Sequence, residues 1–304
     1  MKKIIKTLFF VAALLVASPK LFAQISVGIS IRINPPALPV YTQPACPTDG
    51  YIWTPGYWAY DNDNGDYYWV PGVWVSPPQP GYLWTPGYWG YNGDVYVYHR
   101  GYWGPHIGFY GGVNYGYGYG GSGYHGGQWV GNSFRYNTAV TNVNTTIVHN
   151  TYVDKTVIIN NTTNNTSFNG PGGVAAKPRP EEISAMHESH IQATNDQRSH
   201  QQVAKSDRSQ HTSVNKGKPA TVAMNKVGGD RFDNGGRPAK AGAPLSKTNH
   251  NQQSNADNKP DNDNGANNHQ PKPANTQKVQ HAPKTNHPHT KQHPEPKKEE
   301  KSRE

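Results

Sequence analysis

The amino-acid sequence predicts an all-β fold, an antiparallel meander that curls toward a partial barrel or a sandwich. One observation is a tandem repeat between residues 51 and 105, in which Tyr, Trp, Pro and Gly recur at fixed offsets. The other is the composition of the flanking segments. Residues 25–33 alternate Ile or Val with small or polar residues, and residues 140–159 are rich in Val, Ile and Thr. Both compositions favour strands.

Each copy of the repeat follows the pattern Tyr-x-Trp-x-Pro-Gly-x-Trp. The copies occupy residues 51–60, 67–76, 82–91 and 96–105. The fourth copy is degenerate, because Tyr98 replaces the first Trp and Arg100 replaces the Pro, while Gly101 and Trp103 keep the register. We expect a structural role for the Trp and Gly positions that define the repeat, which are Trp53, Gly56, Trp58, Trp69, Gly72, Trp74, Trp84, Gly87, Trp89, Gly101 and Trp103.

The Pro-Gly dipeptide of each copy allows two interpretations. Pro fixes φ near −65° and Gly accepts positive φ, which suits the central positions of a type II turn. Such a turn would place Trp53 opposite Trp58, an aromatic pair worth about 0.5–1.5 kcal/mol beyond its burial. Alternatively, Pro-Gly bends one continuing strand, because type II turns twist against the favoured hairpin twist. Between copies, residues 91–94 predict a tight hairpin turn, and residues 61–66 and 76–81 predict loops.

The N-terminal segment, residues 1–23, predicts a signal peptide. It has a basic start, an apolar stretch at residues 7–17 and small Ala23 before the expected cleavage. The apolar stretch is shorter than the roughly 20 residues that span a bilayer, although a retained anchor is the alternative. Cys46 lies too far downstream to be a lipidation site. We therefore expect a mature chain that starts near Gln24, has no transmembrane span and is exported to the periplasm, the outer-membrane surface or the extracellular space.

The distribution of charge argues against a nucleic-acid partner. The whole chain carries a net charge of +9, but four of its 29 Lys and Arg residues lie in the predicted signal peptide. Residues 24–176 hold four basic and six acidic side chains, whereas residues 177–304 hold 21 basic and 14 acidic ones. A nucleic-acid binder combines basic groups with aromatic rings in one groove. Here all eight Trp and all nineteen Tyr lie before residue 153, apart from most of the basic residues.

Composition also divides the chain. We expect a repeat domain at 24–176, a partly helical linker at 177–234 and a disordered, basic, low-complexity tail at 235–304, whose few large apolar residues cannot offset the entropy of ordering it. Within the linker, Pro180 followed by two Glu residues predicts a helix start. The apolar stripe over residues 179–205 is weak, so we expect one or two short helices that dock weakly or not at all.

No group of residues predicts catalysis, a metal or a cofactor. The acidic residues of the repeat region lie in predicted turns, where Asp makes local hydrogen bonds, and the histidines lack ligand spacing; these are Asp61, Asp63, Asp66, Asp94, His99, His106, His125 and His149. His187 and His190 flank a Glu but are three apart, whereas the zinc-protease motif places them four apart. The lone Cys46 is either an inert thiol or a link to another chain.

The Trp-x-Pro-Gly-x-Trp core resembles the WXXGXW or YXWGXW repeat proteins of bacterial envelopes. The resemblance continues through residues 101–116, 134–137 and 143–146 to about residue 173. It therefore covers roughly half of the chain, and the tail matches in composition alone. The resemblance implies an exported, envelope-associated protein without an established activity. Lipoprotein-like members carry a lipobox, which this sequence lacks.

These observations predict an exported, non-enzymatic structural or interaction protein of the cell envelope. The alternative is a module that binds glycan or peptidoglycan through exposed Tyr and Trp rings. The Gly/Tyr-rich run is the candidate surface for such binding, and its candidate residues are Tyr115, Tyr117, Tyr119 and Tyr124. Two other interpretations remain open: the repeat aromatics form the core, and the run is an adhesive loop. The expected partners are envelope polysaccharide, peptidoglycan or another envelope protein.

Overall fold

The structure is a computed structural model that describes residues 30–157 and 165–244. The predicted signal peptide and residues 245–304 of the predicted tail lie outside the described residues. Of the strand expected at residues 25–33, only β1 (Ser30–Ile31) is described, and it pairs with a repeat strand.

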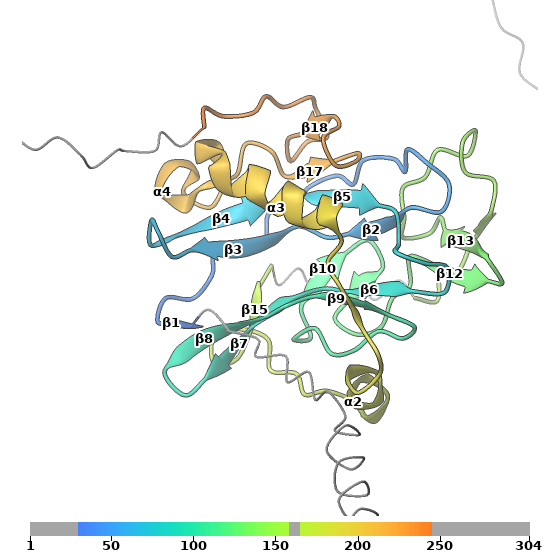
Figure 1. Cartoon of the computed structure of the whole chain (residues 1–304), viewed down its shortest axis with the longest axis horizontal. Helices are drawn as coiled ribbons and strands as arrows, with labels where there is room; N and C mark the ends of the chain where they lie inside the picture. The colour runs from blue at the N-terminus through green and yellow to red at the C-terminus, as the bar shows by residue number, and fades with distance from the viewer. Residues whose placement is uncertain (1–29, 158–164, 245–304) are drawn as a thin grey trace, which may run out of the picture. The chain divides into compact units, whose positions relative to one another are not determined.

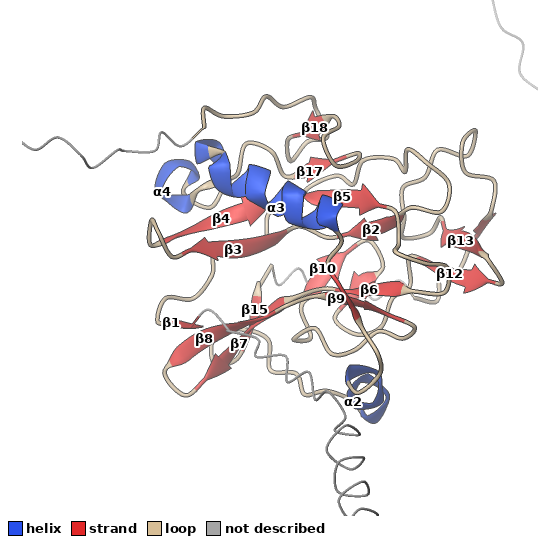
Figure 2. Ribbon diagram, in the orientation of Figure 1, coloured by secondary structure: helices blue, strands red, loops and turns tan. Residues whose placement is uncertain are grey.

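The described residues are mostly strands with a few short helices, as Figure 2 shows. The other strands are β2 (Ile52–Thr54), β3 (Tyr57–Asp61), β4 (Asp66–Val70), β5 (Gly72–Val75), β6 (Leu83–Thr85), β7 (Tyr88–Asn92), β8 (Val95–His99), β9 (Tyr102–Gly104), β10 (Asn114–Gly116), β11 (Tyr119–Gly120), β12 (Gly127–Val130), β13 (Ser133–Asn137), β14 (Thr151–Tyr152), β15 (Phe168–Asn169), β16 (Ile191–Gln192), β17 (Ala223–Met224) and β18 (Arg231–Phe232). The helices are α2 (Pro180–Met186), α3 (Asn195–Ser206), the 3-10 turn η1 (Arg208–Gln210) and α4 (Thr212–Asn215).

The first two copies of the repeat pair with each other in one antiparallel hairpin, which we call the first repeat hairpin (residues 52–75). Trp58 lies opposite Trp69 in the β3–β4 ladder. Trp53 lies opposite Trp74 in the β2–β5 ladder, in the same register. The two ladders therefore continue one another, and the Pro-Gly dipeptides of both copies face each other in the gap between them.

The third and fourth copies form the second repeat hairpin (residues 83–104) in the same way. Trp84 lies opposite Trp103 in the β6–β9 ladder, and Trp89 lies opposite Tyr98 in the β7–β8 ladder. The turn predicted at residues 91–94 is confirmed, because β7 and β8 pair as far as its base. Figure 1 shows the two hairpins running beside each other, each as a line of two strand pairs.

The Pro-Gly dipeptide is not a hairpin turn, so the predicted pairing of Trp53 with Trp58 is wrong and the bent-strand interpretation is correct. The reason is a close approach that only Gly permits. A Cβ on Gly56 would lie within 3.0 Å of the Trp69 ring and of the Gly72 backbone nitrogen, and a Cβ on Gly72 would lie within 3.0 Å of the Trp53 ring. The first Trp of each copy thus covers the Gly of its partner copy.

The second repeat hairpin repeats this contact. Trp84 covers Gly101, and the Tyr98 hydroxyl end covers Gly87. Tyr98 therefore occupies the place of the missing Trp in the fourth copy. The pattern explains why Trp and Gly recur together in the repeat: one supplies the ring and the other supplies the space beneath it.

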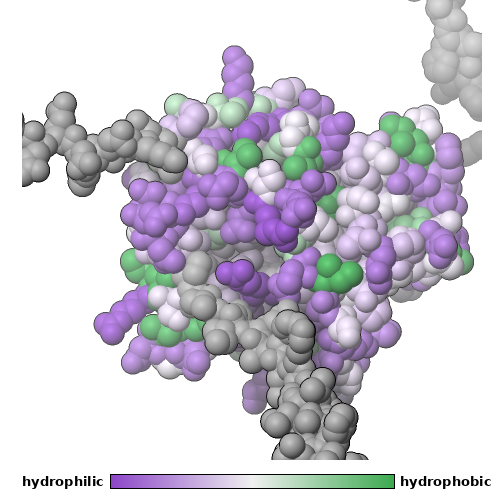
Figure 3. Space-filling model, viewed as in Figure 1, coloured by the Kyte–Doolittle hydropathy of each residue, from purple (hydrophilic) through white to green (hydrophobic). Residues whose placement is uncertain are grey.

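The repeat aromatics form the core. Every Trp except Trp129 is buried. Four of the buried indole N–H groups bond to backbone carbonyls, those of Trp58, Trp69, Trp74 and Trp89; Trp58 donates to Ala37 O at 3.0 Å, and Trp74 donates to Pro44 O at 2.8 Å. Such bonds satisfy buried donors that would otherwise carry a desolvation cost. The face in Figure 3 is mostly hydrophilic, with apolar residues in separate patches.

The linker packs closely, so the expectation of weak docking is wrong. α2 and α3 form as two short helices, and α3 lies against β4. Its side chains attach by polar bonds instead of an apolar stripe. His200 Nε2 lies 2.8 Å from Pro71 O, and Lys205 Nζ lies 2.9 Å from the buried Asp61 carboxylate. Farther along, β17 adds a parallel strand to β5 and buries Ala223. The hydropathy of the linker sequence does not predict such polar and main-chain contacts.

The described strands form six small sheets and no closed barrel. They are not a purely antiparallel meander, because β14, β15 and β17 each pair in parallel with an earlier strand. Parallel pairs need a crossover, which the long connections supply. Of the strand region expected at 140–159, β14 alone is described as a strand. Asn side chains bond to the backbone two residues on, as at Asn144 and Thr146, which favours turns there.

Candidate functional site

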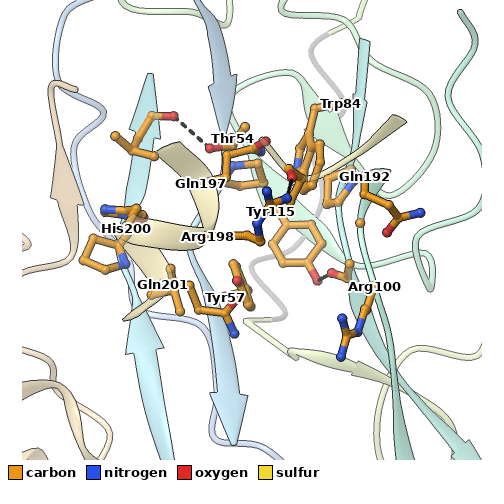
Figure 4. Close-up of a pocket in the computed structure, with 18 of the residues that line it drawn as sticks. Thr54, Tyr57, Trp84, Arg100, Tyr115, Gln192, Gln197, Arg198, His200 and Gln201 are labelled. Atoms are coloured by element: carbon orange, nitrogen blue, oxygen red, sulfur yellow. Dashed lines mark hydrogen bonds between the residues drawn. The ribbon is translucent and has the colours of Figure 1, made fainter. Parts of the chain in front are cut away.

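A cavity of about 410 Å³ lies where the bends of the two repeat hairpins meet the linker (Figure 4). The two hairpins supply two of its walls, and α3 with the residues just before it supplies another. Its lining residues are Thr54, Pro55, Tyr57, Val70, Pro71, Val73, Trp84, Pro86, Gly87, Tyr98, Arg100, Gly101, Tyr115, Gln192, Ala193, Gln197, Arg198, His200 and Gln201. The repeat therefore positions a cavity as well as a core.

Aromatic rings of both hairpins and of β10 line the cavity, together with Pro and Val residues of the hairpins. Tyr57 of the first hairpin stacks on Tyr98 of the second, with ring centroids 5.7 Å apart and an angle of 14° between the planes. Burial raises the pKa of both phenols; electrostatic repulsion from Tyr68 adds to the increase at Tyr57, and repulsion from Tyr57 adds to the increase at Tyr98. Tyr115 donates its hydroxyl to Gly87 O at 2.7 Å. These groups stay neutral at pH 7 and present hydroxyls and ring carbons rather than charge.

The helical wall is fixed by hydrogen bonds. α3 begins at the N-cap Thr194, whose hydroxyl accepts from Gln197 N at 3.3 Å. The Gln197 side chain also accepts the Trp103 indole N–H at 2.8 Å, which ties α3 to the second hairpin. One turn on, His200 bonds to Pro71 O of the first hairpin. Burial lowers the pKa of His200, so it is neutral at pH 7.

The charge of the lining is positive. Arg100 and Arg198 line the cavity, and none of its lining residues is acidic. Figure 4 shows these two arginines on either side of the Tyr115 ring. Arg198 bonds to Ala193 O and to the Asn195 side chain, which are neutral acceptors. Neither arginine forms an ion pair with any residue in 30–157 or 165–244.

Trp84 lines the cavity and contributes an indole N–H, a hydrogen-bond donor without a protein partner among the described residues. The ring is only 8% exposed, and its indole N–H has no hydrogen-bond partner among the residues that the structure describes. By contrast, Trp69, the corresponding residue of the second copy, donates to Val222 O at 3.0 Å. The cavity thus combines aromatic faces, hydroxyls, amides, an indole donor and two guanidinium groups.

The tyrosines expected at an exposed surface lie inward instead. Tyr115 is 7% exposed and Tyr119 is fully buried, so the expectation of free ring faces is wrong for both. Tyr119 donates to Trp84 O at 2.8 Å. Tyr117 and Tyr124 are half-buried against the core; Tyr117 donates to Tyr41 O.

The glycines of the run explain why these tyrosines point inward and not toward solvent. Gly116 and Gly118 adopt positive φ, at 74° and 95°, and so does Tyr117 between them, at 51°. These conformations turn the run back on itself and direct its rings into the core. Of the predicted tyrosines, only Tyr115 lines the cavity. The sequence prediction missed the other lining residues because they come from both hairpins and the linker. The one available signal was the degenerate fourth copy, since both departures, Tyr98 and Arg100, line the cavity.

The other polar residues make structural contacts. Asp61 accepts from Asp63 N at 3.0 Å, the local turn bond that was predicted. His190 follows α2, stacks on Tyr102 with a centroid distance of 3.7 Å and lies outside a helix. Cys46 is buried, and burial raises the pKa of its thiol to about 11, which favours the inert thiol. Within residues 30–157 and 165–244, no three His, Cys, Asp or Glu residues cluster to hold a metal.

A comparison with protein families places the repeat. Residues 49–75 and 80–103 each match the family described as the WXXGXW repeat. No curated protein and no solved structure matches the chain. Among the described helices, none has the length and apolar character needed to cross a membrane. Each family match spans two of the four sequence copies, which together make one repeat hairpin. The chain therefore contains the WXXGXW repeat in two copies, each folded as a hairpin of paired motifs.

Proposed function

We propose that the chain is an exported, non-enzymatic structural and interaction protein of the cell envelope. The observation that carries this proposal is that the aromatic residues of the repeat serve to build the fold. Their rings pack in the core, and several of their indole N–H groups bond to backbone carbonyls, as Trp74 does with Pro44 O and Trp89 with Trp58 O. The repeat is thereby a scaffold, a sandwich-like pair of hairpins, and its loops and cavity are free for contact with a partner.

A mixing experiment tests this proposal. Purified full-length protein is incubated with isolated envelope polymers, and both the bound fraction and the chemical composition of the polymers are measured. We expect stoichiometric retention on an envelope component with no change in its composition. Substoichiometric protein that alters the polymer would contradict the non-enzymatic role, and retention on none of the fractions would contradict the interaction role.

A second candidate function, binding of an envelope saccharide, is favoured by the cavity. Its volume of about 410 Å³ is within the range of small-molecule sites, about 300–1,000 Å³. Aromatic rings such as Tyr57 and Trp84 offer apolar faces to a sugar ring, and the amides of Gln197 and Gln201 offer hydrogen bonds to its hydroxyls. This candidate moves the binding surface from the predicted Gly/Tyr-rich run to the space between the hairpins.

Blocking the cavity tests saccharide binding. Ala193 lines it, so Ala193→Phe fills part of its volume, whereas exposed Ala220 lies outside the lining and Ala220→Phe is the matched control. Binding to peptidoglycan and to envelope polysaccharides is measured by pull-down, with folding checked by circular dichroism. We expect the wild type and the control to bind and Ala193→Phe to fail. Equal binding by both variants would place the site elsewhere, and no binding by the wild type would exclude this function.

A further inference from the structure

We propose that the cavity between the repeat hairpins selects a carboxylate-bearing saccharide, and that Arg100 determines this selectivity. The inference rests on the proposed saccharide binding and adds the charge of the ligand to it. It is carried by the position of Arg100 in the repeat, the unpaired charges of the lining and the donors that surround them.

The position of Arg100 is the first step. In the other three copies a Pro stands at this place, and Pro71 of the first hairpin shows that the bend accommodates it. The fold therefore does not require Arg at the bend. The hairpin closes with either residue, yet Arg brings a cation to the cavity. Tyr98, the other departure of the fourth copy, lines the same cavity.

The second step concerns the state of the cation. Arg100 is exposed, and its guanidinium has no hydrogen bond or ion pair with any residue in 30–157 or 165–244. Arg198, on the helical wall, bonds to neutral acceptors alone among these residues. Two guanidinium groups without an ion-pair partner among the described residues therefore line one cavity, and its lining holds no acidic residue. Guanidinium groups bind carboxylates by paired, charge-assisted hydrogen bonds, so this arrangement favours an anion.

The third step concerns the rest of the ligand. The Tyr115 ring lies between the two arginines in Figure 4, and the stacked Tyr57 and Tyr98 rings also line the cavity. Trp84 adds an indole N–H that has no partner among the described residues. A bare inorganic anion would leave these apolar faces unused. A sugar ring that carries a carboxylate uses both kinds of group, because its ring carbons contact the aromatic faces and its hydroxyls accept from the amide and indole donors. An acidic saccharide therefore fits the lining better than a neutral one.

The experiment compares digalacturonate with its dimethyl ester, which lacks the carboxylate charges and carries a methyl group on each carboxyl, by isothermal titration calorimetry with the full chain. We expect digalacturonate to bind about tenfold or more tightly than the ester, since one charge-assisted contact is worth at least about 1.4 kcal/mol. Arg100→Gln and Arg100→Pro should each remove most of that preference. Arg100→Pro restores the repeat pattern, so an unchanged melting temperature separates loss of charge from misfolding. Arg208→Gln, at an exposed arginine outside the lining, should leave the preference intact.

The outcomes separate the inference from the function on which it rests. Equal affinity for the acid and the ester would overturn charge selection and leave saccharide binding in place. A preference for the acid that survives both Arg100 variants would overturn the role of Arg100. If neither ligand binds while envelope polysaccharide is retained in the pull-down, the inference fails and saccharide binding stands. If no saccharide binds at all, both fail.

Discussion

Replacing Gly56 with Ala tests the closest contact of the first repeat hairpin. Gly56 does not adopt positive φ, so Ala is conformationally permitted and the effect is steric. The added Cβ would lie 2.8 Å from the Gly72 backbone nitrogen and within 3.0 Å of the Trp69 ring. Trp69 is 1% exposed and its indole is bonded to Val222 O at 3.0 Å, so the ring cannot rotate away.

The magnitude follows from two opposing effects. Overpacking a core costs about 1–3 kcal/mol, and the upper end applies because a backbone atom is also in contact. The lower entropy of the unfolded Ala chain offsets about 0.4–1 kcal/mol of this. We therefore expect Gly56→Ala to lower the free energy of unfolding by about 2 kcal/mol. For a chain of this size that corresponds to a melting temperature lower by about 4–8 °C.

The assay is urea unfolding followed by tryptophan fluorescence, since the buried Trp residues report the whole core. Gly90→Ala is the matched control, because the nearest atoms to its added Cβ belong to side chains alone, the exposed His99 ring at 3.1 Å and the Tyr88 ring at 3.3 Å, with no backbone atom among them. We expect the control to stay within about 0.5 kcal/mol of the wild type. If Gly56→Ala is as stable as Gly90→Ala, Trp69 does not cover Gly56 and the explanation of the repeat is refuted.

Two further predictions follow from the structure. Trp53 and Trp69 occupy corresponding positions, but the Trp53 indole N–H is buried and unpartnered among the described residues, whereas Trp69 donates to Val222 O. In urea unfolding, Trp69→Phe should therefore be less stable than Trp53→Phe by about 1 kcal/mol, and the reverse order would contradict the assigned hydrogen bond. Burial lowers the pKa of His200 in the folded chain, so as the pH falls the unfolded chain binds a proton at this residue before the folded chain does. The contribution of His200 to the free energy of unfolding is therefore complete above about pH 6.5 and falls as the pH decreases below that value. His200→Gln should flatten this decline, and an unchanged pH profile would show that His200 is not buried in its neutral form.

The limits of sequence prediction are clearest at the repeat. Its spacing predicted strands and a structural role for the Trp and Gly residues, and the structure has strands and buried rings at these positions. The pairing partner was ambiguous because every copy has the same pattern, so Trp53 was compatible with Trp58 or with Trp74. The contact between the Trp69 ring and Gly56 joins two copies and exists only in the folded chain.

The cavity could not be predicted from the sequence either, because its lining also comes together only in the folded chain. Tyr57, Arg100 and Arg198 are far apart in the sequence, and the two bends and α3 bring them together. The polar sequence of α3 suggested a loosely attached helix, because hydropathy does not predict a polar bond such as that between His200 and Pro71 O. The tyrosine run looked exposed because its glycines suggested open space, whereas their positive φ values direct rings such as Tyr119 inward.

The pairing of copies is tested most directly by nuclear Overhauser effects between indole protons in protein with labelled tryptophan. The ring centroids of Trp53 and Trp74 are 5.4 Å apart, and those of Trp58 and Trp69 are 5.3 Å apart. We expect cross-peaks for both pairs and none between Trp53 and Trp58, which belong to different core clusters. A cross-peak between Trp53 and Trp58, with none between Trp53 and Trp74, would show that each copy folds on itself and would contradict the paired-copy hairpin.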